Sequence, residues 1–192
     1  MNQQFSHNNY VCRSKWFSFF GKEFYFDDPS GNVVFYAHMK AFKLKEDIRL
    51  YSDASKSTEM LTIKARQILD FSACYDVVDT VSGQKVGAFK RKGFHSMLKD
   101  KWIILDVSDR EIGEIAEDSW VMALLRRYLM NLIPQRFSAV VEGAAVCEFR
   151  QNFNPFLLKI AVDFSKDTGQ KLDRRLGIAA VLLLAAIEGR QQ

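Results

Sequence analysis

The sequence predicts a mainly β protein of the α+β class, in which β-hairpins form a barrel or sandwich around one buried helix. Three observations lead to this prediction. Aromatic residues make up 13% of the 192 residues, and rings suit half-buried strand surfaces. A hairpin pattern occurs at 75–91 and again at 102–118. The most apolar stretch, residues 176–187, has no polar face and comes after the expected strands.

The chain begins with a polar segment, which an aromatic one follows. Residues 1–15 contain no continuous apolar stretch, so we expect no secretory signal and interpret them as a flexible tail. We expect the aromatic segment to form the first one or two strands and to fill the core. The alternative is that its rings insert at a membrane interface. These aromatic residues are Trp16, Phe17, Phe19, Phe20, Phe24, Tyr25 and Phe26.

Alternation of apolar and polar residues predicts the next strands. Residues 33–38 are apolar at nearly every position, which indicates a strand covered on both faces, while 47–50 and 61–66 alternate strictly. Asp- or Ser-led turns separate the strands, because these side chains bond their own backbone. The turn signals are DDPSGN at 27–32, DTVSGQK at 79–85, DVSDRE at 106–111 and DFSKDTGQK at 163–171.

The two hairpins form an internal repeat. Residues 75–91 and 102–118 share an aromatic residue, alternating apolar residues, an Asp, a polar turn and an apolar-Gly pair. Gly87 and Gly113 are expected to permit a bulge or a close approach of two backbones. A weaker copy at 160–172 runs into the last helix instead of a returning strand. Repetition of a small β unit favours a barrel or sandwich with similar halves.

Two helices are predicted. Residues 119–132 have apolar positions at helical spacing on one face, and Pro134 stops them. Residues 172–189 include the apolar run, which would span about 18 Å against the ~30 Å of a bilayer core. We therefore expect no transmembrane helix but a helix enclosed by protein, inside the barrel. Asp167, Thr168 or Asp173 can cap its start.

The order of these motifs resembles the tubby C-terminal-like superfamily, which includes the phospholipid scramblases and the LURP-one-related proteins. The resemblance covers about residues 20–190 and implies a single domain over 1–192. It implies a closed antiparallel β-barrel of about twelve strands, wrapped around the buried C-terminal helix. The residues that carry it are Tyr75, Asp79, Gly83, Val86, Gly87, Trp102, Asp106, Ile112, Gly113, Arg126, Arg127, Asp163 and the helix from Leu172.

A cluster of basic residues is the main candidate site. On a hairpin and the loop after it, such a cluster could bind anionic lipid headgroups, at ~1 kcal/mol per basic residue near a charged membrane. The alternative is a solvated surface whose lysines prevent strand-to-strand aggregation. A second basic stretch, at 40–49, is diluted by two acidic residues. The cluster comprises Lys85, Lys90, Arg91, Lys92, Lys99 and Lys101; the second stretch comprises Lys40, Lys43, Lys45 and Arg49.

The segment from Asp163 resembles a calcium-binding loop only in part. Asp163 and Asp167 occupy positions one and five, but Thr168 stands at position six, where Gly is needed. Arg174 replaces the carboxylate of position twelve. We therefore expect no bound metal, and interpret Asp163 and Asp167 as turn and helix-capping residues, with calcium as the weak alternative.

Nothing in the sequence indicates catalysis. The chain has no Gly-x-Ser-x-Gly motif, no phosphate-binding Gly loop and no dinucleotide fingerprint, so we expect no cofactor. Cys12, Cys74 and Cys147 are far apart in the sequence and lack a Cys-x-x-Cys pair, which predicts free, buried thiols in a reducing compartment.

The expected function is that of a cytoplasmic, non-enzymatic binding or scaffold module. The resemblance implies peripheral binding of anionic phospholipid, because tubby proteins bind phosphoinositides. The alternative is a scramblase-like phospholipid transporter, which the short last helix and the incomplete calcium loop disfavour. A net charge of +4 and the lack of a recognition helix give nucleic acid little support, and no protein partner is indicated.

Overall fold

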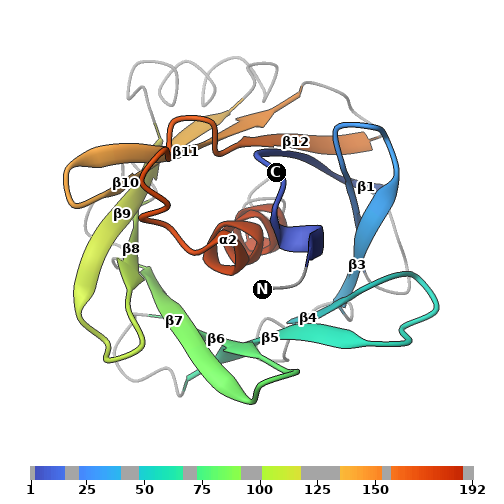
Figure 1. The fold of residues 1–192 in the computed structure, drawn as a ribbon, viewed down its shortest axis with the longest axis horizontal. Helices are drawn as coiled ribbons and strands as arrows, with labels where there is room; N and C mark the ends of the chain where they lie inside the picture. The colour runs from blue at the N-terminus through green and yellow to red at the C-terminus, as the bar shows by residue number, and fades with distance from the viewer. Residues whose placement is uncertain are drawn as a thin grey trace.

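Twelve antiparallel strands close into one barrel around the C-terminal helix (Figure 1). The computed structural model describes residues 3–15, 22–39, 48–66, 73–91, 101–117, 135–152 and 157–187. The strands are β1 (Asn9–Lys15), β2 (Lys22–Asp27), β3 (Val33–Met39), β4 (Ile48–Tyr51), β5 (Glu59–Ala65), β6 (Cys74–Asp79), β7 (Gln84–Arg91), β8 (Lys101–Leu105), β9 (Glu111–Glu117), β10 (Arg136–Val141), β11 (Ala144–Gln151) and β12 (Leu157–Asp163). A 3₁₀ turn, η1 (Gln3–Phe5), precedes them and the helix α2 (Arg174–Ile187) follows. The predicted fold class is confirmed.

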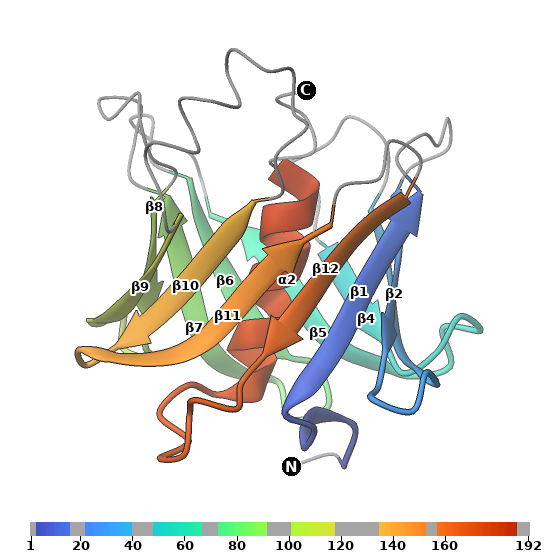
Figure 2. The same ribbon diagram turned by 90° about the horizontal axis from the view of Figure 1, so that it is seen from above.

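The barrel has two different ends (Figure 2). At one end, which we call the hairpin end, tight connections join successive strands, and the chain passes from β12 into α2. It comprises residues 3–9, 27–33, 51–59, 79–85, 105–111, 141–144 and 163–175. At the opposite end, which we call the far end, β1, β3, β5, β7, β9, β11 and α2 finish. A side chain can therefore be assigned to an end from its position along a strand.

The hairpin pattern that the sequence shows twice occurs five times in the structure. In each hairpin, one residue of the second strand has no partner on the first, so the pairing register shifts there. Such bulges bend a strand and increase its twist, which helps a sheet to close into a barrel. The bulged residues are Val34, Met60, Val86, Ile112 and Val146.

Glycine follows the bulge in the two hairpins that revealed the repeat. A Cβ on Gly87 would lie 2.5 Å from the carbonyl oxygen of Leu105, and one on Gly113 would lie 2.2 Å from that of Val140. Neighbouring strands thus approach closer than any side chain allows, which confirms the role predicted for these glycines.

Aspartate side chains hold the turns of the hairpin end, as predicted. Asp106 Oδ1 accepts hydrogen bonds from the backbone N–H groups of Ser108 (2.8 Å) and Arg110 (2.9 Å). Asp28 Oδ1 does the same with Ser30 and Asn32, in the first hairpin. These bonds satisfy backbone N–H groups of the turns, which have no hydrogen-bond partner in a neighbouring strand.

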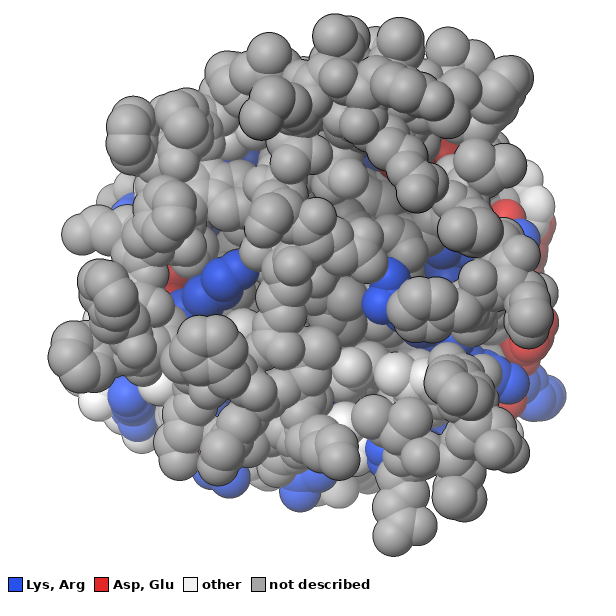
Figure 3. Space-filling view, turned by 180° about the vertical axis from the view of Figure 1, so that it is seen from behind, with Lys and Arg blue, Asp and Glu red and all other residues white. Residues whose placement is uncertain are grey.

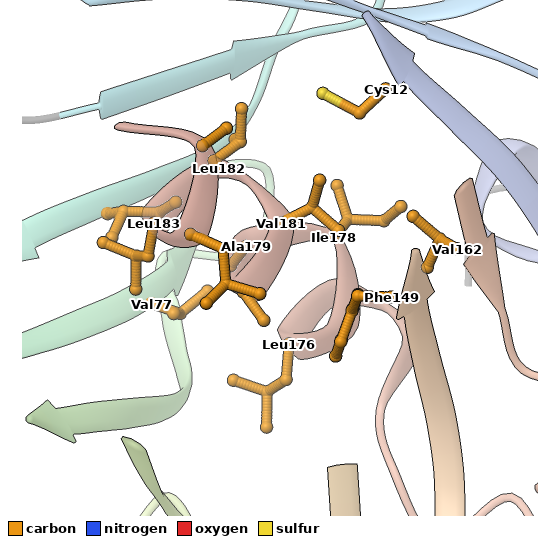
Figure 4. Packing of buried hydrophobic residues seen from close by; sticks show 14 of the residues in the cluster. Cys12, Val77, Phe149, Val162, Leu176, Ile178, Ala179, Val181, Leu182 and Leu183 are labelled. Atoms are coloured by element: carbon orange, nitrogen blue, oxygen red, sulfur yellow. The ribbon is translucent and has the colours of Figure 1, made fainter. Parts of the chain in front are cut away.

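The helix α2 fills the barrel. Asp173 caps it, because its Oδ1 accepts from the backbone N–H of Arg175 at 2.9 Å. Its side chains spread towards strands on all sides, as Figure 4 shows for Ile178, Val181 and Leu183. Ile178 and Val181 are fully buried and Leu183 is 1% exposed. A helix without a polar face is stable only in such surroundings, so the predicted central helix is confirmed.

The expectation of a flexible tail over residues 1–15 is wrong for the described residues. Asn9–Lys15 forms β1, which pairs with β12 on one side and β2 on the other. Tyr10 and Cys12 alternate with the outward Asn9, Val11 and Arg13, and both are 1% exposed. The sequence does not alternate clearly between apolar and polar residues here, because the outward Val11 is apolar and the buried Ser14 is polar.

The aromatic segment is described only in part. Phe24 and Phe26, in β2, are fully buried in the core, which confirms packing for these two rings. Residues 16–21, the second basic stretch except Arg49, and the predicted helix at 119–132 lie outside the described residues. Within the described ranges, no helix combines the length and apolarity that crossing a bilayer needs.

Candidate anion-binding surface

The six residues of the predicted basic cluster do not form one patch. Lys85 begins β7 at the hairpin end, whereas Lys90 and Arg91 end this strand at the far end, and Lys101 begins β8 there. Lys92 and Lys99 lie outside the described residues. The length of β7 therefore separates Lys85 from the others.

Lys85 belongs to a network of alternating charges on the outer wall. Its Nζ lies 2.6 Å from Asp109 Oδ1 and 3.3 Å from Asp76 Oδ1. Arg66 contacts the same two carboxylates, and donates from Nε to Asp76 Oδ2 at 2.7 Å. Hydrogen bonds from Arg66, which has the larger effect, and from Lys85 lower the pKa of the Asp109 carboxyl to about 2. The charge of Lys85 is thus balanced locally, and we exclude it from the candidate surface.

Adjacent residues of β7 point to opposite faces of the wall. Lys90 is exposed on the outer face, and among the described residues it forms no ion pair. Arg91 follows it on the inner face, where its Cζ lies 5.9 Å from the centre of the Trp102 ring. Lys101 is outward and pairs with Glu114 of β9. Of the four described residues of the cluster, only Lys90 keeps the predicted role of an exposed cation without an ion pair.

Three further cations resemble Lys90 in exposure and lie on other strands. All three are exposed, outside the hairpin end, and without an ion pair among the described residues. Figure 3, which views the far end, shows Lys and Arg side chains reaching the surface at several places around it. We call these residues and Lys90 the far-end cations: Lys64 of β5, Lys90 of β7, Arg136 of β10 and Lys159 of β12.

The barrel carries opposite charges towards its two ends. Among the described residues, the hairpin end contains twelve Asp and Glu but seven Lys and Arg, a net charge of −5. The remaining described residues contain twelve Lys and Arg but five Asp and Glu, a net charge of +7. A whole-chain charge of +4 conceals this separation. Three of these twelve cations, Arg13, Arg49 and Arg66, pair with Asp27, Glu59 and Asp109 of the hairpin end, so part of the difference is neutralised within the wall.

The comparisons with known proteins agree with this fold. A model of the LURP-one-related family matches residues 33–183. The chain belongs to the LURP-one-related family. A crystal structure of an Arabidopsis thaliana protein is similar over 93% of this chain and 92% of that one, with a TM-score of 0.52 and 16% identity. Among curated proteins, no sequence matches significantly.

The calcium candidates of this LURP-one-related chain are engaged by other groups. Asp163 Oδ1 accepts from the backbone N–H of Ser165 at 2.8 Å. Asp167 accepts from the backbone of Lys171 at 2.8 Å and pairs with Arg174 Nη1 at 3.1 Å. Arg174 is the residue that replaces the last calcium ligand. In the part of the chain described, no three His, Cys, Asp or Glu residues are grouped so that they could hold a metal.

The described interior of the LURP-one-related barrel is filled largely by α2 and the inward side chains of the strands. A cavity of about 10 Å³ lies between the end of α2 and strands β10–β12, among Phe137, Phe149, Gln151, Leu158 and Leu184. This volume corresponds to a single water molecule. The cysteines are free, as predicted; Cys12 and Cys147 are buried and Cys74 is partly exposed. Burial raises the pKa of the Cys12 thiol, so it remains protonated and unreactive.

Sequence reasoning missed three of the far-end cations. Lys64, Arg136 and Lys159 are far apart in the sequence. Lys64 alternates with the apolar residues of its strand, and Arg136 and Lys159 have no other cation beside them. The signal that could have found them is the outward position near the far end of a strand. That position depends on knowing where each strand begins and which way it runs.

Proposed function

We propose that this LURP-one-related protein is a non-enzymatic binding module whose far end meets an anionic phospholipid surface. The observation that carries the proposal is the separation of charge along the barrel, −5 at the hairpin end and +7 over the other described residues. The four far-end cations are exposed and unpaired among the described residues, so binding lipid breaks no internal ion pair of theirs.

The expected strength follows from the number of cations. A Lys or Arg near an anionic membrane contributes ~1 kcal/mol, so four of them supply ~4 kcal/mol, about a thousandfold in affinity. Binding of this kind is peripheral, reversible and sensitive to salt. It needs no cofactor and no catalytic group.

A lipid-transporting function finds no specific support in the described part of the barrel. Transport through the interior would need space for an acyl chain, whereas the cavity between α2 and β10–β12 measures about 10 Å³. The described residues that resemble a calcium loop are bonded to their own backbone and to Arg174. Transport is therefore one of the outcomes that the vesicle assay distinguishes.

Co-sedimentation with vesicles tests the proposal. The intact protein is mixed with phosphatidylcholine vesicles that contain or lack phosphatidylserine, at low and at high salt. We expect binding only to the anionic vesicles, and loss of it when salt shortens the screening length from about 10 Å at 0.1 M to about 3 Å at 1 M. Equal binding to both vesicles, or none at low salt, contradicts the proposal. Flipping of a dye-labelled lipid would show a transporter instead.

A further inference from the structure

Three tyrosines form a row on the outer face of the wall. Tyr36 of β3 lies directly opposite Tyr25 of β2 and Tyr51 of β4 in the strand registers. The residues beside them in these strands belong to the core, so the three side chains face outward. The ring centres of Tyr25 and Tyr36 are 5.2 Å apart, and those of Tyr36 and Tyr51 are 6.5 Å apart. We call these three residues the tyrosine row.

The tyrosine row keeps apolar surface and one hydroxyl group available to a partner. Tyr25 and Tyr51 are partly exposed, and Tyr36 between them is 3% exposed. The hydroxyls of Tyr36 and Tyr25 donate to the Glu23 carboxylate, at 2.8 Å and 3.3 Å. Among the described residues, the Tyr51 hydroxyl has no hydrogen-bond partner. Tyrosines that combine an apolar ring with a polar tip are typical of protein interfaces.

The charges that the described residues place around the tyrosine row cancel. Arg13 lies over the ring in β2, with Cζ 4.9 Å from its centre, and pairs with Asp27 at 2.7 Å. Lys56 lies over the Tyr36 ring, with Nζ 5.8 Å from its centre, and Glu23 supplies the opposite charge beside it. A nucleic acid or another anionic polymer therefore gains no net attraction from these charges. The row fits a partner that is recognised through apolar surface and backbone.

The spacing of the row matches the repeat of a polyproline II helix. Tyr25 and Tyr51 lie on strands with one strand between them, so their backbones are about 9.6 Å apart across the wall. A polyproline II helix advances about 9.3 Å in one turn of three residues. Prolines three residues apart can therefore contact the two partly exposed rings. Such a helix has no internal hydrogen bonds, so one of its carbonyl groups can accept from the Tyr51 hydroxyl.

We propose that the tyrosine row docks a proline-rich segment of a partner protein, which lies across β2–β4 in the polyproline II conformation. Aromatic surfaces recognise such segments because the helix is preformed and its ordering costs little entropy. The Lys56 side chain gives way at a small cost, because a cation–π contact at an exposed site is weak. The row lies near the hairpin end, where β2 and β4 finish. This partner and a membrane at the far end therefore do not compete, and the barrel can link the two.

Two isomeric peptides test the spacing. Both are labelled with fluorescein and contain the same alanines and prolines. The prolines are three residues apart in the first peptide, and alternately two and four residues apart in the second. Binding to the intact protein is measured by fluorescence anisotropy. We expect the first peptide to bind more tightly than the second, because only its prolines repeat with the distance between the two rings.

Variants of Tyr51 test the surface. Tyr51→Ala removes the ring and the hydroxyl, whereas Tyr51→Phe removes the hydroxyl alone and keeps the packing. His38→Ala is the matched control, because His38 is a partly exposed ring on the same face of β3, two residues from Tyr36. We expect the dissociation constant of the first peptide to rise at least about fivefold in Tyr51→Ala, the loss typical of a central interface residue. The rise should be smaller in Tyr51→Phe and absent in His38→Ala, and melting curves establish that each variant folds.

The inference is overturned if neither peptide binds the wild type, if both bind equally, or if Tyr51→Ala binds the first peptide as well as His38→Ala does. Binding of oligouridylate instead of the peptides, lost in Tyr51→Ala, would assign the row to nucleic acid. Lys90→Glu separates this result from the proposed function. We expect this variant to bind phosphatidylserine vesicles more weakly and to keep its affinity for the first peptide.

Discussion

Gly177 lacks a side chain because the ring of Phe164 occupies the space that a Cβ would need. A Cβ there would lie 2.3 Å from Cε1 and Cζ of that ring. Phe164 is itself fully buried at the point where the chain leaves β12 for α2. One missing methyl group thus lets the connection pack against the first turn of the helix.

Replacing this glycine tests the packing. Alanine favours a helix over glycine by about 1 kcal/mol, but the overpacking caused by Gly177→Ala is expected to cost about 1–3 kcal/mol. We expect a net fall in Tm, measured by thermal melting. Gly169→Ala is the control, because its Cβ would meet nothing closer than Lys171 Cγ at 3.7 Å. A Gly177→Ala variant more stable than the wild type would show that the ring moves freely.

Asp167 fixes the approach to the helix through charge as well as hydrogen bonds. Its side chain is 1% exposed and that of its partner, Arg174, is 11% exposed, so both are shielded from water. The guanidinium also lies over the Phe164 ring, with Cζ 4.4 Å from its centre.

Asp167→Asn keeps an acceptor for the backbone but removes the charge. Breaking a buried pair from one side leaves the other charge uncompensated, and typically costs about 3–5 kcal/mol. We expect a loss of this order in urea unfolding. Asp163→Asn, at a partly exposed turn where the side chain accepts one backbone hydrogen bond from Ser165, should cost far less. Equal losses in both variants contradict a special role for the buried pair.

At the scale of elements, the outer wall is held by charges that belong to different hairpins. Asp109, in the turn between β8 and β9, contacts Arg66 beyond the end of β5 and Lys85 of β7. These contacts lower the pKa of Asp109 from its ordinary value of 3.8 to about 2. The stabilisation is therefore complete above the ordinary value, and is lost as the pH falls through about 2.

Thermal melts between pH 5 and pH 2 test this network. Part of the fall in Tm of the wild type is expected below about pH 4, and Asp109→Asn should lack that part because its side chain does not titrate. Glu111→Gln is the control, since Glu111 is exposed and forms no ion pair among the described residues. Parallel curves for wild type and Asp109→Asn would show that the network does not stabilise the fold.

The elements that sequence reasoning found are those with a strong local signal. The apolar run predicted α2, and the repeated Asp-turn-Gly pattern predicted two hairpins. The other hairpins have the same bulge, but Phe35, Leu61 and Cys147 take the place of the glycine. The repeat was therefore hidden in them. β1 was not predicted because it lacks a clear alternation, with an apolar Val11 facing outward and a polar Ser14 facing inward.

At the scale of the whole molecule, the predicted basic cluster and the observed surface differ. Lys90 and Arg91 are neighbours in sequence but lie on opposite faces of the wall, and Lys85 lies at the other end of the strand. Conversely, Lys64 and Lys159 are distant in sequence but both belong to the wall beyond the hairpin end. This arrangement results from closure of the barrel, which brings together residues that are distant in the sequence. A short stretch of sequence therefore does not reveal it.

The same closure places opposite charges towards opposite ends. Each hairpin contributes acidic turn residues at one end; four of the five contain Asp, whose side chain stabilises tight turns, and the fifth contains Glu142. Lysines and arginines remain along the strands and at the far end. The charge separation is thus a consequence of building the barrel from Asp-led hairpins, and the proposed function uses it.

A comparison of two triple charge reversals tests whether the position of the charge on the barrel decides lipid binding. The first variant, Lys64→Glu with Lys90→Glu and Arg136→Glu, changes far-end cations. The second, Arg110→Glu with Lys166→Glu and Lys171→Glu, makes the same change of net charge at the hairpin end. Both are assayed by co-sedimentation with phosphatidylserine vesicles at low salt, after melting curves establish that they fold. We expect the first variant to lose binding and the second to keep most of it. Equal loss in both would contradict it, because net charge alone and not its position would then decide binding.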